Sequence, residues 1–95
     1  MKIKIIIADD HEMVREGLEV MISKIPDIEI IAQATNGEEL VNLTKELAPD
    51  VILTDIKMPR MSGTEAAIAI KQQLPHIGII ALSSFDEESL IRDAL

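Results

Sequence analysis

The chain has 95 residues, 47% of them apolar, which suits one domain and rejects a disordered segment. Its formal net charge of −8, from 17 acidic and 9 basic residues, argues against direct binding of nucleic acid, which needs clustered Lys and Arg. The absence of cysteine excludes disulfides, thiolate nucleophiles and cysteine-bound zinc.

The N-terminal residues do not have the pattern of a leader or a membrane segment. The acidic pair Asp9-Asp10 ends the apolar run too early for a signal peptide. No apolar run approaches the length of a membrane span. We therefore expect a cytoplasmic protein that makes no membrane contact.

Four short apolar runs predict β-strands. Each is nearly continuous and rich in Ile, Val, Leu or Ala, as in the buried strands of a parallel sheet. The predicted strands are residues 3–8, 28–34, 51–55 and 77–82.

Between these runs, polar caps and apolar residues at a spacing of three or four predict helices. The first helix is expected over residues 12–25. The caps of the next three are marked by Asn36 with Glu39, Ser62 with Glu65, and Ser84 with Glu87. The first three helices are expected to end before Pro26, Pro49 and Pro75. This alternation predicts a single α/β domain, with a parallel sheet between two layers of helices.

Three carboxylates lie at the carboxyl ends of two predicted strands: Asp9 and Asp10 directly follow the first, and Asp55 is the last residue of the third. Open α/β sheets form their ligand crevices at the carboxyl ends of strands, so these groups converge if the two strands are neighbours. Carboxylates held close together repel one another, and a divalent cation relieves that repulsion. A ligand set made only of oxygen suits Mg²⁺.

An ionised aspartate can attack phosphorus without a separate base. Asp55 beside Mg²⁺ is therefore interpreted as the acceptor of a phosphoryl group. A hydroxyl from Ser83 or Ser84, after the fourth strand, can reach the oxygens of the phosphoryl group added to Asp55. In the segment after Asp55, Pro59 fixes the loop and Gly63 can supply a positive φ.

Each of these residues also has a plainer interpretation. Asp9 with Glu12 matches a D-x-x-E helix cap, Asp55 a turn residue, and Ser83 a turn hydroxyl. A shared site is preferred because the plain interpretations would require three coincidences at equivalent strand ends.

Other candidate residues give weaker signals. His11-Glu12 begins like the zinc motif H-E-x-x-H, but Arg15 replaces the second histidine. His11 and His76 are interpreted as surface or capping residues, and Arg60 as a solvated loop residue.

Three motifs are similar to those of response-regulator receiver domains of two-component signalling. They are A-D-D-H at 8–11, D-I-K-M-P-R-M-S-G at 55–63 and I-A-L-S at 80–83. The resemblance runs along the whole chain and implies a flavodoxin-like three-layer sandwich. The strand order it implies is 2-1-3-4, without the family's fifth strand.

The resemblance also implies residue roles. Asp55 would be the phosphoacceptor and Ser83 the switch hydroxyl. Asp10 and Asp55 would bind Mg²⁺ directly, Asp9 through water, and Lys57 through its backbone carbonyl. A histidine kinase would donate the phosphoryl group, and the chain would be a signalling switch that catalyses its own phosphorylation.

Residues 8–18 resemble the branch of the family whose receivers precede a helix-turn-helix output domain, which implies control of transcription. The family continues with a strand and a helix beyond Leu95. We therefore expect residues 1–95 to be a C-terminally incomplete receiver domain without its output domain. The fourth strand would be an edge carrying Ile77, Ile79 and Ile80, and we expect self-association through it.

Two other functions remain open. An aspartyl phosphohydrolase usually has a second carboxylate two residues after its nucleophile, but Lys57 occupies that position. A receiver-like module could instead dimerise or dock without efficient phosphorylation.

Overall fold

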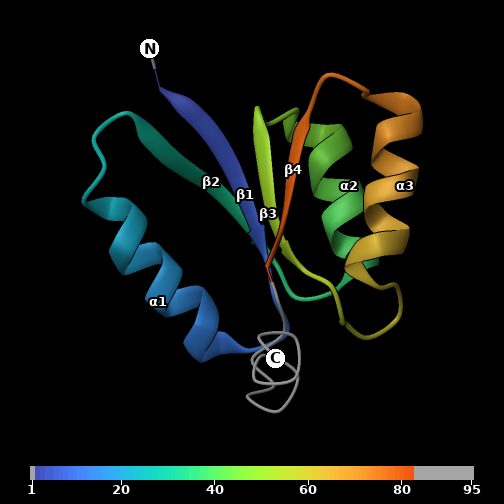
Figure 1. Cartoon of the computed structure of the whole chain (residues 1–95), viewed down its shortest axis with the longest axis horizontal. Helices are drawn as coiled ribbons and strands as arrows, with labels where there is room; N and C mark the ends of the chain where they lie inside the picture. The colour runs from blue at the N-terminus through green and yellow to red at the C-terminus, as the bar shows by residue number, and fades with distance from the viewer. Residues whose placement is uncertain (1, 83–95) are drawn as a thin grey trace, which may run out of the picture.

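Four parallel strands form one sheet, in the order β2-β1-β3-β4 (Figure 1). The computed structural model describes residues 2–82. The strands are β1 (Ile3–Ala8), β2 (Ile28–Ala34), β3 (Val51–Asp55) and β4 (Gly78–Leu82). The helices are α1 (Glu12–Ser23), α2 (Gly37–Leu47) and α3 (Gly63–Gln73). The predicted α/β class and strand order are confirmed.

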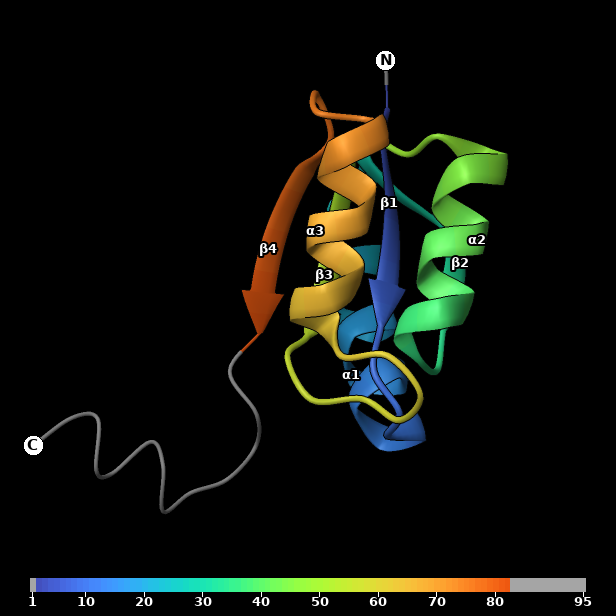
Figure 2. The same cartoon turned by 90° about the vertical axis from the view of Figure 1, so that its right-hand side faces the viewer.

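The helices form a layer on each face of the sheet. Helix α1 covers one face, and α2 and α3 lie side by side on the other (Figures 1 and 2). The β1-to-β2 connection runs in one direction across the sheet, and the β2-to-β3 and β3-to-β4 connections run in the other. Because such crossovers are right-handed, α1 lies on one face and α2 and α3 lie on the other. None of the helices in residues 2–82 is long and apolar enough to cross a membrane.

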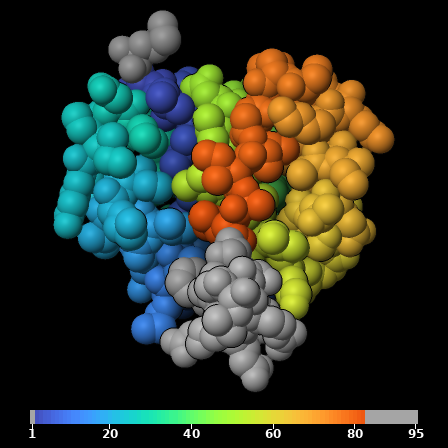
Figure 3. Space-filling view, viewed as in Figure 1, coloured from blue at the N-terminus to red at the C-terminus, as the bar shows by residue number. Residues whose placement is uncertain are grey.

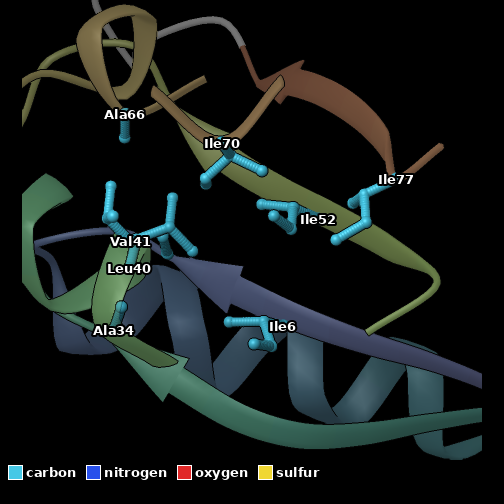
Figure 4. Packing of buried hydrophobic residues seen from close by; sticks show 9 residues of the cluster. Ile6, Ala34, Leu40, Val41, Ile52, Ala66, Ile70 and Ile77 are labelled. Carbon is cyan, nitrogen blue, oxygen red and sulfur yellow. The ribbon is translucent and has the colours of Figure 1, made fainter. Parts of the chain in front are cut away.

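The apolar core has two parts because successive side chains of a strand point to opposite faces. In β1, Ile5 and Ile7 pack on the α1 side with Ile22. Ile6 packs on the other side, below α2 and α3 (Figure 4). That larger cluster consists of Ile6, Ala8, Ala34, Leu40, Val41, Ile52, Ala66, Ile70 and Ile77.

The two predicted caps within the described residues are present. The Asn36 side chain accepts a hydrogen bond from the Glu39 amide at 2.8 Å, at the start of α2. The Glu39 carboxylate accepts from the Thr35 amide. At the start of α3, Ser62 and Glu65 form the reciprocal capping box.

Three predicted boundaries differ from the structure. Helix α1 ends at Ser23 instead of the predicted Ile25, and α3 ends at Gln73 instead of the predicted Leu74. Both endings precede a proline, which disfavours helical backbone in the residue before it. Strand β4 begins at Gly78, so Ile77 does not lie on the strand. The Ile77 side chain is buried in the core. The cap predicted at Ser84 and its helix lie outside the described residues.

Strand β4 is at one edge of the described sheet. Its surface lies between those of α1 and α3 (Figure 3), and Ile80 is 53% exposed. Self-association through this edge stays a prediction.

Gly17, inside α1, has no structural need for glycine. A Cβ placed there would meet no atom within 4 Å. Gly17→Ala is expected to raise the free energy of unfolding by about 0.5–1 kcal/mol, because alanine loses less backbone entropy in a helix. Urea denaturation followed by circular dichroism measures this change. A lower midpoint would contradict the open environment at Gly17.

Candidate metal centre

Strands β1 and β3 are neighbours, and Ala8 pairs with Thr54 in the sheet. The residues that follow this pair, Asp9 and Asp55, therefore lie at the same rim. Four possible ligand atoms lie within 4.8 Å of one another, one from each of Asp9, Asp10, His11 and Asp55. The structure thus brings together the three carboxylates selected from the sequence and adds a histidine.

Asp9 is almost fully buried and binds His11, the residue just before α1. Its Oδ1 accepts a hydrogen bond from the His11 amide at 2.9 Å and lies 2.8 Å from His11 Nδ1. Asp10 Oδ1 lies 3.1 Å from the same nitrogen. The N-cap of α1 is His11, whose side chain makes no capping bond, so the D-x-x-E cap interpretation of Asp9 is wrong.

The two carboxylates act on the exposed His11 ring. Its hydrogen bond with Asp9 raises the pKa of His11 most, followed by the charge of Asp10. When protonated, the ring offsets part of the negative charge at this rim.

Arg15 fixes the backbone of the acidic pair. Its Nη1 donates a hydrogen bond at 2.7 Å to the carbonyl oxygen of Asp9. The guanidinium thus reaches from α1 back to the end of β1. This role was not visible in the sequence, where Arg15 only excluded a zinc motif.

Asp55 is 4% exposed, and its Oδ1 has no hydrogen-bond partner among residues 2–82. Burial raises the pKa of Asp55, and the charge of Asp9 raises it further. The backbone amides of Ile56 and Lys57 oppose this rise. The carboxylate is therefore poorly compensated when ionised.

The loop from Ile56 to Ser62 is held closely against Asp55. The Gly63 amide donates to the Ile56 carbonyl at 2.8 Å. A Cβ on Gly63 would overlap the carbonyl oxygen of Asp55, so glycine is required for close approach. No glycine in the described residues has a positive φ, and the left-handed residue of this loop is Arg60, with φ 68°. The expectation that Gly63 supplies the positive φ is therefore wrong.

The donor set fits a hard divalent cation. It offers carboxylate oxygens from two strand ends, one of them buried without a partner. Such oxygens are the ligands that Mg²⁺ prefers. A cation would counter both the burial and the Asp9 charge that raise the pKa of Asp55.

The other predicted residues are placed differently. The Lys57 side chain is exposed in the loop after Asp55. His76 is exposed just before β4 begins, at the opposite rim of the sheet. Ser83 lies outside the described residues, so its switch role stays a prediction.

Asp55→Asn is expected to raise the melting temperature of the metal-free chain by a few degrees at pH 7. The folded-state pKa of Asp55 is raised, so its ionised form destabilises the fold above that pKa, and asparagine removes this cost. The gain should vanish as the pH falls below about 4, where the carboxyl is neutral in both states.

Thermal unfolding in chelator measures this change. Asp27→Asn is the control, since Asp27 is exposed and the substitution makes the same change in net charge. An equal gain in both variants would show that net charge is the cause and would contradict local repulsion at Asp55.

Residues 5–95 match the family described as the response regulator receiver domain. The chain is 42% identical over 93 residues to the transcriptional regulatory protein LnrK of Bacillus subtilis, covering 98% of this chain and 42% of LnrK. It is 42% identical over 95 residues to the response regulator protein VraR of Staphylococcus aureus, covering 100% of this chain and 46% of VraR. The chain therefore spans less than half the length of these relatives.

Solved structures agree with this likeness. The response regulator domain of Thermotoga maritima CheB has a TM-score of 0.85 and 34% identity, covering 99% of this chain and 71% of that one. RcsB of Salmonella enterica serovar Typhimurium, bound to a promoter in the presence of phosphomimetic BeF₃⁻, has a TM-score of 0.80 and 28% identity. It covers 87% of this chain and 43% of that one. The chain belongs to the response regulator receiver domains, and its relatives include proteins named as transcriptional regulators.

Proposed function

We propose that Asp55 accepts a phosphoryl group in a reaction that depends on Mg²⁺, and that this modification switches an output surface. The observation that carries the proposal is the Asp55 carboxylate itself. It is buried, has an oxygen without a partner among residues 2–82, and lies beside the charge of Asp9. This arrangement costs stability in the absence of a cation, which suits a reactive group better than a structural one.

The residues have distinct roles in the proposed site. Asp10 and Asp55 would hold Mg²⁺ through their side chains, Asp9 through a water molecule, and Lys57 through its backbone carbonyl. Bound Mg²⁺ supplies positive charge that offsets the charge on the transferred group. Arg15 and His11 keep the acidic turn in place from the start of α1.

The chemical step needs no base from the protein. An oxygen of the ionised Asp55 forms a bond to phosphorus while the bond from phosphorus to the donor breaks, and that electron pair leaves with the donor. The acid anhydride that forms adds roughly one to two negative charges at the strand end. The Ser83 hydroxyl is proposed to move toward the oxygens of the phosphoryl group on Asp55.

The family and the relatives support the proposed partners. A histidine kinase is the donor expected for a receiver domain, and the longer relatives are named as transcriptional regulators. RcsB was solved on promoter DNA in the presence of a phosphomimetic. We therefore propose that this receiver controls a helix-turn-helix output domain, consistent with its own strongly acidic composition.

Incubation with acetyl phosphate and Mg²⁺ is expected to add one phosphoryl group to the wild-type chain. Asp55→Asn should not be labelled, because the attacking carboxylate is absent, whereas Asp27→Asn should be labelled like wild type. Chelator should abolish the reaction, since the cation offsets the developing charge. Intact-mass spectrometry at neutral pH measures the product.

Two results would overturn this proposal. Labelling that persists in Asp55→Asn would place the acceptor elsewhere. No labelling of a folded wild-type chain would favour a module that only docks or dimerises.

A further inference from the structure

The start of α2 contacts the loop that follows the proposed phosphoacceptor. Gly37 is the first residue of α2, and its amide donates a hydrogen bond at 2.9 Å to the Met61 carbonyl. Amides in the first turn of a helix have no acceptor within that helix, so this carbonyl satisfies one of them. Segments distant in the sequence are thereby joined at the loop that follows Asp55.

Only glycine fits at this contact. A Cβ on Gly37 would overlap the carbonyl oxygen of Met61 and would press on its carbonyl carbon and Cβ. The φ of Gly37 is not positive, so backbone freedom is not the reason for glycine. The reason is the close approach of α2 to the loop.

The loop adopts a conformation that needs such support. The Met61 amide donates to the Pro59 carbonyl at 2.7 Å, around Arg60 at φ 68°. A three-residue turn of this kind with positive φ at its centre is rare and strained. Two residues outside the turn hold the loop. The Gly37 amide donates to the Met61 carbonyl, and the Gly63 amide donates to the Ile56 carbonyl.

Arg60, at the centre of this turn, also faces a cavity beside α2. It lines a cavity of ≈ 280 Å³ together with residues of α2 and its cap. The other lining residues are Asn36, Glu38, Glu39, Asn42, Leu43 and Glu46. Arg60 and α2 therefore border the same space, beside the backbone contact between Gly37 and Met61.

We propose that Gly37 is a positioning residue for the metal and phosphoryl site. By seating Met61, it holds the strained turn in one conformation, and the turn fixes the beginning of the loop at Ile56 and Lys57. The amides of these two residues act on the Asp55 carboxylate. The start of α2 thus determines the position of the loop backbone at the proposed cation site. This inference rests on the proposed function, because binding of Mg²⁺ is its readout.

Gly37→Ala is expected to weaken Mg²⁺ binding about 10-fold or more, the range seen when supporting groups around a metal site are lost. The matched control is Gly17→Ala, which should bind Mg²⁺ like wild type because Gly17 contacts nothing within 4 Å. Calorimetric titration with Mg²⁺ alone, well below each melting temperature, measures the affinity. A purely structural role would lower the melting temperature of Gly37→Ala and leave its affinity unchanged, which would overturn the proposal.

Arg60→Gly provides a second variant in case Gly37→Ala does not fold. Glycine adopts a positive φ without strain, so this variant should fold, but its turn is no longer restricted to one conformation. Its Mg²⁺ affinity is expected to fall several-fold. If Gly37→Ala is unfolded, an unchanged affinity in Arg60→Gly overturns the inference and a reduced one supports it. A wild-type chain that binds no Mg²⁺ would instead overturn the proposed function, and this inference with it.

Discussion

Burial of the Asp55 carboxylate beside the charge of Asp9 is the constraint on which the rest of the site depends. Both carboxylates are buried at one rim because β1 and β3 are neighbours and end at the same level. Burial and a like charge both disfavour the ionised form of Asp55. A cation bound at this rim would stabilise that form. Arg15 holds the backbone of Asp9, and the His11 ring offsets part of the negative charge when it is protonated.

Much of the fold could be predicted because local signals agree with one another. The continuous apolar runs identified four strands, and the cap residues Asn36 and Ser62 marked where α2 and α3 begin. The C-terminal ends of α1 and α3 were harder to predict. Pro26 and Pro75 also disfavour helical backbone in the residue before each proline. The strand order came from the likeness to receiver domains, since apolar runs alone do not say which strands pair.

The acidic residues of the site could also be selected from the sequence, since each ends or directly follows a predicted strand. The residues that support them could not. Arg15 acts on a backbone carbonyl of Asp9, and Gly37 acts on a backbone carbonyl of Met61, so neither contact leaves a pattern along the chain. Gly63 was selected correctly as part of the loop, but for backbone freedom and not for its close approach to Asp55.

The most direct test of the central claim locates a bound cation by its effect on individual amides. Mn²⁺, which also prefers oxygen ligands, can be titrated into ¹⁵N-labelled protein while amide signals are followed by NMR. We expect the signals of residues 9–11 and 55–57 to broaden first, ahead of those near the acidic residues Glu38 and Glu46 of α2. Broadening that begins at α2, or spreads evenly over the acidic surface, would contradict a metal centre between β1 and β3.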